Sequence, residues 1–327
     1  MSESMTMVDA VNLALAHELE QDTDVVLLGE DIGVNGGVFR ATAGLLERFG
    51  PHRIMDTPLA ENLIAGLAIG MASQGLKPVA EIQFMGFIFP TMEQLIAHGA
   101  RMRNRTRGRL SCPLVIRAPF GGGIHAPEHH SESTEALLAH IPGLRVVIPS
   151  SPARAYGLLL AAIRCPDPVI FLEPKRIYRA VKQPVSDNGI ALPLDTCFTL
   201  REGNDITLIS WGAMIKETLE AADQLAQDGI SCEVIDVATL NLLDHATLLA
   251  SVSKTGRCVI VHEAPHHGGM GAEISATLAE RGLLDLKAPV ARVTGFDTIM
   301  PYYRLENQYL PNSADIVEAA RQTLEFV

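Results

Sequence analysis

The sequence lacks the features of a secreted or membrane-spanning chain. Its N-terminus carries no charged-then-apolar leader, and no apolar run reaches the length of about 18 residues that a membrane span needs. Its five cysteines are odd in number, widely spaced and without a Cys-x-x-Cys pair, which argues against a disulfide framework and a structural zinc site. We therefore expect a protein of the reducing cytoplasm, without a membrane partner.

Aromatic residues and positive charge are also scarce. Aromatics make up 5% of the 327 residues although 47% are hydrophobic, so the core is expected to be aliphatic and rich in Ala and Gly. Such a core suits layered helices and parallel strands, or a large subunit interface. The formal charge of −12 argues against a nucleic-acid partner. The single basic cluster, residues 101–109, is interpreted as a solvated helix end and loop in preference to an anion site.

Several common site motifs are absent. The glycines after Gly29 form no G-x-G-x-x-G fingerprint, and the chain has neither a G-x-x-x-x-G-K-[ST] loop nor a G-x-S-x-G elbow. His125, His129 and His130 are close in sequence, but no matching carboxylate or cysteine pattern accompanies them, so zinc is not expected. These absences exclude a dinucleotide site, a P-loop and a serine nucleophile of the usual kinds.

What the chain does contain is a regular alternation of strand-like and helix-like segments. The expected strands are 25–28, 78–84, 113–117, 144–149, 169–173, 205–210, 232–236, 258–261 and 290–294. The expected helices are 7–20, 90–103, 152–163, 213–227, 244–252, 268–279 and 314–326. This order predicts an α/β fold in which mostly parallel sheets are flanked by helices.

The alternation breaks between residues 179 and 203. Pro184, Pro193 and the turn-forming residues 187–189 dominate that stretch. We therefore expect two domains, over residues 1–185 and 204–327, joined by a linker at 186–203.

The stretch from Asp56 to Asn62 predicts a strand, a turn and a helix. Pro58 suits a turn or a first helical turn, and the helix after it is expected to pack closely through Gly66 and Gly70. Glu61 then lies at or near the helix start. It is either a helix-terminus charge or a buried working acid, and local features favour the first interpretation.

Polar side chains follow four expected strands. They are Glu30 with Asp31, Glu61, Gln83 ahead of Phe87, and the histidines of residues 125–130. In α/β folds, ligands bind at the carboxyl ends of the strands. An acid, an imidazole and an apolar wall at one sheet edge would suit a site that perturbs pKa values.

A set of short motifs runs in order along the whole chain. They are Gly29-Glu30-Asp31, Gly36-Gly37-Val38-Phe39-Arg40, Asp56-Thr57-Pro58-Leu59-Ala60-Glu61, Ala80-Glu81-Ile82-Gln83-Phe84, His130-Ser131, Pro142-Gly143-Leu144, Val147-Ile148-Pro149 and Glu263-Ala264-Pro265. Together they resemble the beta subunits of the thiamine-diphosphate-dependent, decarboxylating component of 2-oxo acid dehydrogenase complexes. Bacterial pyruvate dehydrogenase (acetyl-transferring) is the most similar member, followed by the branched-chain 2-oxo acid and acetoin enzymes. The resemblance implies a transketolase-like pyrimidine-binding domain and a transketolase C-terminal-like domain.

The resemblance also implies roles for named residues. Glu61 would hydrogen-bond a ring nitrogen of the cofactor's aminopyrimidine and so favour the tautomer that takes the thiazolium proton. Leu59, Gln83 and Phe87 would line the pyrimidine pocket. His130 would steady the reacting centre or assist acyl transfer to the lipoyl group. Glu30 would belong to an acidic path between two cofactors, or be only a solvated strand-end acid.

A potassium site and a missing half-site follow from the same resemblance. Main-chain potassium ligation would involve Leu114, Val115, Ala162, Cys165 and Asp167, although Cys165 and Pro166 depart from the Asp-rich loop expected there. No G-D-G motif for diphosphate and Mg²⁺ occurs in the chain.

An alpha subunit would therefore bind Mg²⁺ and the diphosphate, within an alpha2-beta2 heterotetramer. The C-terminal domain would dock the peripheral-subunit-binding domain of the acyltransferase core, whose lipoyl domain is the acyl acceptor. A stand-alone transketolase-like enzyme is disfavoured by the missing motif. A non-catalytic interaction subunit is disfavoured by the presence of Glu61, Gln83 and His130 together.

Overall fold

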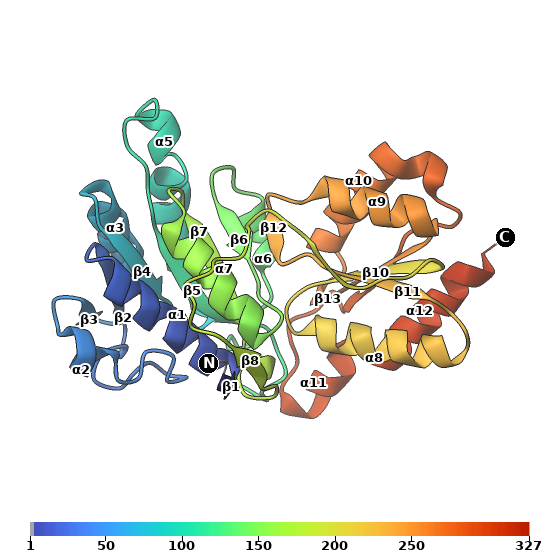
Figure 1. Ribbon diagram of the computed structural model, residues 1–327, viewed down its shortest axis with the longest axis horizontal. Coiled ribbons are helices and arrows are strands. Elements are labelled where there is room, and N and C mark those ends of the chain that lie inside the picture. The colour runs from blue at the N-terminus through green and yellow to red at the C-terminus, as the bar shows by residue number, and fades with distance from the viewer. Residues whose placement is uncertain (1–2, 327) are drawn as a thin grey trace. The chain divides into compact units, whose positions relative to one another are not determined.

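The computed structural model describes residues 3–326 and divides into two compact units (Figure 1). Unit 1 comprises the residues up to Phe120 together with Leu137–Leu194, and unit 2 comprises Gly121–Ala136 and the residues from Asp195 onward. The chain therefore passes from one unit to the other after Phe120, Ala136 and Leu194. Among the described residues, no helix combines the length and the apolar character needed to cross a membrane.

Unit 1 contains a parallel sheet with the strand order β6-β7-β5-β4-β2-β3. Its strands are β2 (Val25–Gly29), β3 (Ile54–Asp56), β4 (Lys77–Glu81), β5 (Val115–Phe120), β6 (Arg145–Val147) and β7 (Val169–Pro174). Strands β2, β5 and β7 are buried along their whole length, as parallel strands covered on both faces must be. A separate antiparallel pair joins β1 (Glu3–Met5) to β8 (Gln183–Val185).

The helices of unit 1 follow these strands. They are α1 (Met7–Gln21), α2 (Leu45–Phe49), α3 (Glu61–Ser73), α4 (Met92–Gln94), α5 (Met102–Arg105), α6 (Glu135–Ala139), which spans the second crossing, and α7 (Pro152–Arg164), with short turns η1 (Met85–Phe87), η2 (Phe89–Thr91), η3 (Leu95–Gly99) and η4 (Lys175–Ile177). Ser151 caps α7, because its hydroxyl accepts the Arg154 N–H. Helices α1 and α7 pack against each other, and α3 packs on β2 and β4 (Figure 1).

The single helix expected over residues 90–103 is wrong. The segment is broken into η2, α4, the π-helical turn η3 and α5. In the π-helical turn the Ala100 N–H reaches back to the Leu95 carbonyl at 2.9 Å. The Ala100 carbonyl also meets Gly143 so closely that an added Cβ there would lie 2.2 Å from its oxygen. The helix is therefore distorted where a distant segment approaches it, which helical periodicity in the sequence does not report.

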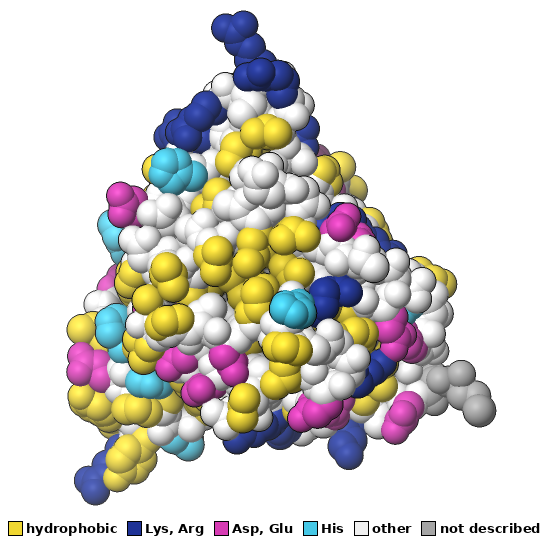
Figure 2. All heavy atoms as spheres, turned by 90° about the vertical axis from the view of Figure 1, so that its left-hand side faces the viewer, with side chains coloured by type: hydrophobic (Ala, Val, Ile, Leu, Met, Phe, Trp, Pro, Cys, Tyr) yellow, Lys and Arg dark blue, Asp and Glu magenta, His cyan; other side chains and the backbone are white. Residues whose placement is uncertain are grey.

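The expected close packing of α3 through its glycines is also wrong within this chain. A Cβ added at Gly70 would meet nothing within 4 Å, and one at Gly66 would meet only Gln94 at an ordinary 3.6 Å. The buried face of α3 consists of Ile64, Ala65, Ala68, Ile69 and Ala72. Leu63 and Leu67 are 49% and 42% exposed. Figure 2 shows hydrophobic side chains gathered in the middle of the face on which α2 and α3 lie.

Unit 2 contains a second sheet with the strand order β14-β13-β10-β11-β9. Its strands are β9 (Phe198–Arg201), β10 (Ile206–Ser210), β11 (Cys232–Asp236), β13 (Cys258–Pro265) and β14 (Ala291–Gly295), and β12 (Thr239–Asn241) follows β11 in sequence. All pairs in the sheet are parallel except β9 with β11. Strand β9 was not expected, since it lies in a stretch that the turn signals marked as irregular.

The helices of unit 2 lie on both faces of its sheet. They are α8 (Met214–Gln227), α9 (His245–Thr255), α10 (Met270–Gly282), α11 (Tyr303–Tyr309) and α12 (Ser313–Glu325), with the turn η5 (Leu283–Asp285). Helices α8 and α12 cover one face, and α9 and α10 cover the other (Figure 1). On the first face, Leu208 and Val234 of the sheet pack with Met214 and Ile316 in a fully buried aliphatic cluster. The expected α/β class is therefore confirmed in both units.

Candidate functional site

The expected site residues of unit 1 emerge from three neighbouring strands. Gly29 of β2 pairs with Asp56 of β3 on one side and with Glu81 of β4 on the other. The Thr57 N–H continues the ladder by donating to the Gly29 carbonyl at 3.0 Å. Because the strands are parallel and level at their ends, the residues that follow them leave the sheet at a single edge. Glu30, Glu61 and Gln83 all belong to these exits.

Glu61 stands at the first position of α3. Its predecessor Ala60 makes no side-chain capping bond, so the first N–H groups of the helix point toward an uncapped end. A carboxylate at this position is stabilised by the helix dipole, and here it is half-buried. The expectation that Glu61 begins the helix is confirmed.

Glu30 and Glu61 lie close enough to interact. Burial raises the pKa of Glu30, and the negative charges of Asp31 and Glu61 raise it further. The structure therefore brings together two of the acids that the sequence singled out.

Asp56 holds the loop that follows Glu30. Its carboxylate accepts the backbone N–H groups of Gly33 at 2.6 Å and Val34 at 3.2 Å. A Cβ added at Gly33 would lie 2.9 Å from the Asp56 Oδ2 atom, so the loop lies directly on the carboxylate. Sequence reasoning gave Asp56 no role. The only local signal was an acid directly after a strand end and before the turn to Glu61.

Aromatic side chains form one wall beside Gln83. The ring of Phe84 meets Phe87 edge to face with centroids 5.8 Å apart, and it meets Phe39 at 5.5 Å. Gln83 and Phe87 are half-buried, whereas Leu59, on the turn before α3, is 70% exposed. This chain alone therefore leaves Leu59 available to a ligand or partner.

A buried ion network lies beneath this edge. Arg117 donates to Glu173 at 2.6 and 2.9 Å and to Glu81 at 2.8 Å, and the Tyr178 hydroxyl also donates to Glu173. Burial alone would lower the pKa of Arg117, but the charges of Glu173 and Glu81 outweigh it and raise that pKa. Burial raises the pKa of Glu81, and the charge of Glu173 adds to the effect against the attraction of Arg117. In the sequence, this network is indicated by one charged residue inside each of three otherwise apolar expected strands.

His130 lies in unit 2, on the loop of residues 121–134. Its Nδ1 atom is 2.8 Å from the Glu128 carbonyl oxygen. The base of the loop is closed by the Gly121 N–H, which donates to the Glu132 carbonyl at 3.0 Å. Ser133 then donates to Glu263 of β13 at 2.9 Å. His130 is therefore held by contacts within unit 2, whereas Glu61, Glu30, Gln83 and Phe87 belong to unit 1.

A second cluster of buried titratable groups lies in unit 2. Burial raises the pKa of Glu135 to about 7, and the charge of Glu263 contributes. Glu135 Oε1 is 3.3 Å from the indole Nε1 of Trp211, which stacks on His262 with centroids 5.2 Å apart. Burial lowers the pKa of His262 to about 4. The motif Glu263-Ala264-Pro265 is the only part of the sequence analysis that pointed to this cluster.

The residues expected to bind potassium have other partners. The Leu114 carbonyl accepts the Val169 N–H at 2.9 Å, and the Ala162 carbonyl accepts the Cys165 N–H at 3.2 Å. Val115 is buried within β5. Across residues 3–326, no group of three or more His, Cys, Asp or Glu side chains is arranged to hold a metal ion.

The charge beside these residues opposes a cation. The Asp167 carboxylate is 2.7 Å from Arg103 Nε and 3.9 Å from Arg145 Nη1. The Arg145 guanidinium also lies 3.6 Å from the Cys165 sulfur. Two guanidinium groups next to Asp167 make this an unfavourable place for a potassium ion.

Comparison with known proteins shows the family. The model of the transketolase pyrimidine-binding domain matches residues 3–181, and that of the transketolase C-terminal domain matches residues 196–316. A curated protein of Staphylococcus epidermidis named "Pyruvate dehydrogenase E1 component subunit beta" is 51% identical over 322 residues, which are 98% of this chain and 99% of that protein. A Staphylococcus aureus protein of the same name is 49% identical over the same shares.

A solved structure shows the same fold at lower identity. It is described as "Split gene transketolase, inactive beta4 tetramer", and it superposes with a TM-score of 0.82 at 23% identity over 99% of each chain. The identity to the two staphylococcal proteins is far higher and covers nearly their whole length. The chain therefore belongs to the family of pyruvate dehydrogenase E1 component beta subunits, with a transketolase pyrimidine-binding domain and a transketolase C-terminal domain.

Proposed function

We propose that this chain is the beta subunit of the decarboxylating component of a pyruvate dehydrogenase complex. In this role it takes part in the thiamine-diphosphate-dependent decarboxylation of pyruvate and the reductive acetylation of the lipoyl group of the acyltransferase core. The observation that carries the proposal is the exit of Glu30, Glu61 and Gln83 from three adjacent parallel strands, in a chain about half identical to proteins of that name.

The residues at the edge of unit 1 fit the pyrimidine half of thiamine diphosphate. When bound, this cofactor supplies the thiazolium that accepts the electrons released as carbon dioxide leaves. Glu61, at the uncapped start of α3, shares a proton with a ring nitrogen of the pyrimidine. Gln83 and Phe87 orient the ring, and Leu59 excludes water from it. Glu30, whose pKa is raised by burial and by the charges of Asp31 and Glu61, lies close to Glu61.

A separate role is proposed for His130, which belongs to unit 2. Its Nδ1 atom faces the Glu128 carbonyl, which can only accept, so Nδ1 carries the proton in the neutral ring. Nε2 is then the basic atom. We propose that this atom steadies the reacting centre or assists acyl transfer to the lipoyl group.

The partner half of the site belongs to an alpha subunit. No G-D-G motif for diphosphate and Mg²⁺ occurs in this sequence, so we propose that the alpha subunit binds both. The exposed Leu59, Leu63 and Leu67 are available for such an interface within an alpha2-beta2 assembly. Docking of the peripheral-subunit-binding domain, and a cytoplasmic location, stay predictions. Potassium also stays a prediction, one that Arg103 and Arg145 argue against.

Co-expression tests the proposal. The chain is produced with its alpha subunit, and three activities are measured: decarboxylation of pyruvate and of branched-chain 2-oxo acids, cleavage of acetoin, and acylation of the lipoyl group by each substrate. We expect kcat/KM to be highest for pyruvate. A higher value for a branched-chain acid or acetoin would move the assignment to that enzyme. Assembly without turnover of any of these would support a non-catalytic interaction subunit.

A binding measurement tests the division of the site between two chains. Titration calorimetry of the isolated chain should detect no thiamine diphosphate binding at micromolar concentration, because the diphosphate half is missing. Tight binding by this chain alone would contradict the split site.

A further inference from the structure

The carboxylate of Glu306 meets the loop that carries His130. Glu306 lies on α11, and its side chain is only 2% exposed. Its Oε1 atom accepts the Gly123 N–H at 2.7 Å, and its Oε2 atom accepts the His125 N–H at 2.8 Å. One buried side chain therefore fixes two alternate amides of a segment that lies about 180 residues away in sequence.

A third contact completes this arrangement. The Nδ1 atom of His125 lies 2.8 Å from the same Oε2 atom. Gly123 and His125 both have positive φ, +88° and 54°, so the backbone between them turns sharply around the carboxylate. A carboxylate can be buried at low cost when several N–H groups donate to it. The backbone from Gly123 to His125 thus turns around the carboxylate of Glu306 and points its N–H groups at it.

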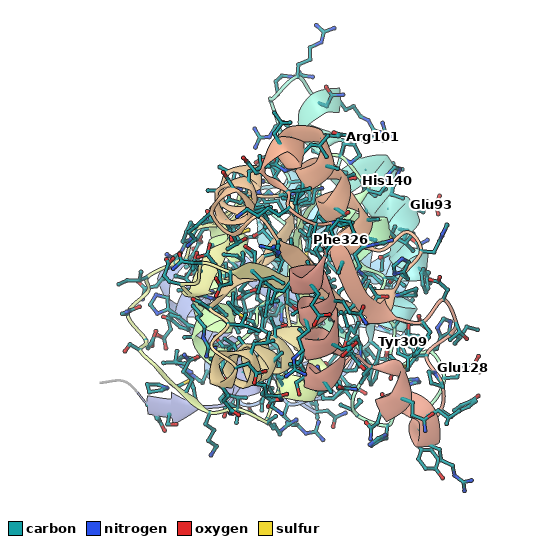
Figure 3. All side chains as sticks on the ribbon, turned by 90° about the vertical axis from the view of Figure 1, so that its right-hand side faces the viewer. Glu93, Arg101, Glu128, His140, Tyr309 and Phe326 are labelled. Carbon is teal, nitrogen blue, oxygen red and sulfur yellow. The ribbon has the colours of Figure 1, made fainter. Side chains whose placement is uncertain are left out.

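The loop also contacts the start of α11 at a second point. The Tyr302 hydroxyl lies 3.3 Å from Glu128 Oε2. Figure 3 labels Glu128 on the loop and Tyr309 on α11, on the same flank of unit 2. The Glu128 carbonyl in turn faces His130 Nδ1 at 2.8 Å. A continuous set of contacts therefore leads from α11 to His130.

We infer that Glu306 is a positioning residue for the proposed reaction: its carboxylate holds the turn from Gly123 to His125 and thereby fixes where the loop presents His130. The inference deepens the proposed function and rests on it for the role of His130. The contacts of Glu306 with Gly123 and His125, called the Glu306 clamp below, do not depend on that role. Glu306 itself touches no reacting atom and acts only through the loop.

Hydrogen exchange of the assembled enzyme tests the clamp directly. Glu306→Gln keeps the size of the side chain but removes its charge, and its amide nitrogen cannot accept from an N–H group. We expect exchange in peptides covering residues 121–130 to become about tenfold faster or more, as the loss of charged hydrogen bonds implies. Peptides from β13 and α12 should keep their rates. Glu318→Gln, on the exposed side of α12, is the matched control and should change neither region.

Steady-state kinetics separate positioning from a purely structural role. We expect Glu306→Gln to lower kcat about tenfold while the KM for pyruvate changes little, and Glu306→Asp to recover part of the loss. His125→Ala keeps both backbone contacts with Glu306 and should lower kcat less. It replaces Glu306→Gln as the test variant if Glu306→Gln does not fold. Unchanged exchange in residues 121–130, or loosening of all of unit 2 with normal kcat, would overturn the inference. If the wild type decarboxylates no 2-oxo acid, the proposed function fails while the exchange result still decides the clamp.

Discussion

Arg117 and Glu173 form a two-point ion pair inside the sheet of unit 1, with Nε–Oε1 and Nη2–Oε2 distances of 2.6 and 2.9 Å. Both side chains are almost fully buried. Because Arg117 also donates to Glu81, its guanidinium links β4 to β7 across β5. The edge that carries the candidate site is therefore supported by charges as well as by apolar packing.

Arg117→Met should destabilise the protein severely. The substitution leaves Glu173 and Glu81 as buried carboxylates without their cation, which costs about 3–5 kcal/mol. Urea denaturation followed by circular dichroism measures the loss. Arg103→Met, which removes an exposed pair with Asp167, is the control and should leave the stability nearly unchanged. Equal losses in the two variants would show that the buried network contributes no more than a surface pair.

Glu61→Gln should preserve assembly and abolish most of the activity. An amide cannot share a proton with the pyrimidine nitrogen as a carboxyl group does, so kcat should fall about 10²–10⁴-fold. Size-exclusion chromatography and the decarboxylation assay check the two parts of this prediction. Glu47→Gln, at an exposed position of α2, is the control. Near-normal turnover in the Glu61 variant would remove Glu61 from the catalytic role.

Asp56→Asn should loosen the loop beside Glu30. The amide keeps one acceptor oxygen but loses the charge that binds the Gly33 and Val34 N–H groups. We expect hydrogen exchange in residues 31–37 to become several-fold faster, with lower activity, because each charged hydrogen bond contributes about 1.5–3 kcal/mol. Asp24→Asn, at an exposed position before β2, should leave both properties unchanged.

Glu135 should make the stability of the protein depend on pH. Burial raises its pKa from 4.5 to about 7, so the folded state keeps a proton that the unfolded chain releases. The contribution of Glu135 to the free energy of unfolding is complete below pH 4.5 and is lost as the pH rises toward 7. Thermal denaturation between pH 5 and pH 8 should therefore show that Glu135→Gln removes this decline, whereas the exposed Glu273→Gln keeps it.

His262 acts in the opposite direction over a lower range. Its pKa is lowered from 6.5 to about 4, so the unfolded state binds a proton that the folded state refuses. Stability is lost as the pH falls from 6.5 toward 4. The pH ranges in which Glu135 and His262 affect stability overlap between pH 4.5 and pH 6.5. For this reason the difference in stability between wild type and Glu135→Gln is the quantity to measure. A difference that does not vary with pH would contradict the raised pKa of Glu135.

The cysteines should be unreactive in the folded protein. All five are free and buried, and burial raises the pKa of Cys112 and Cys232 to about 11. Few thiolates form at such positions, and the reagent cannot reach them. Ellman's reagent at pH 8 should therefore label none in the native assembly and all five after unfolding in urea. Rapid labelling of one cysteine would identify an exposed thiolate.

Local patterns predicted much of the fold. The strand at Cys232–Asp236 was expected with its observed bounds, because five apolar or alternating residues between turns are a local signal. Glu61 was placed at a helix start for a similar reason, since Pro58 limits where the helix can begin. The breaks within residues 89–105 were not foreseen, because the contact of Ala100 with Gly143 depends on tertiary structure.

The parts of the site that depend on strand order and long-range contacts could not be predicted. Arg117, Glu81 and Glu173 lie in separate expected strands, and only the order β7-β5-β4 makes them neighbours. Glu306 lies on a seven-residue helix without a clear apolar period, and its partners lie in a distant loop. The acids Glu30 and Glu61, by contrast, were found from their positions after apolar strands.

The assignment of residues 121–136 to unit 2 limits how the gene can be divided. A gene fragment beginning near residue 195 would encode the second sheet but would omit residues 121–136, which belong to the same unit. Glu306 would lose both amides, Glu263 would lose Ser133, and Trp211 would lose Glu135. Exchanging the C-terminal half between relatives therefore requires residues 121–136 to be exchanged with it. The part of the gene that must be exchanged is made of two separate stretches of the sequence.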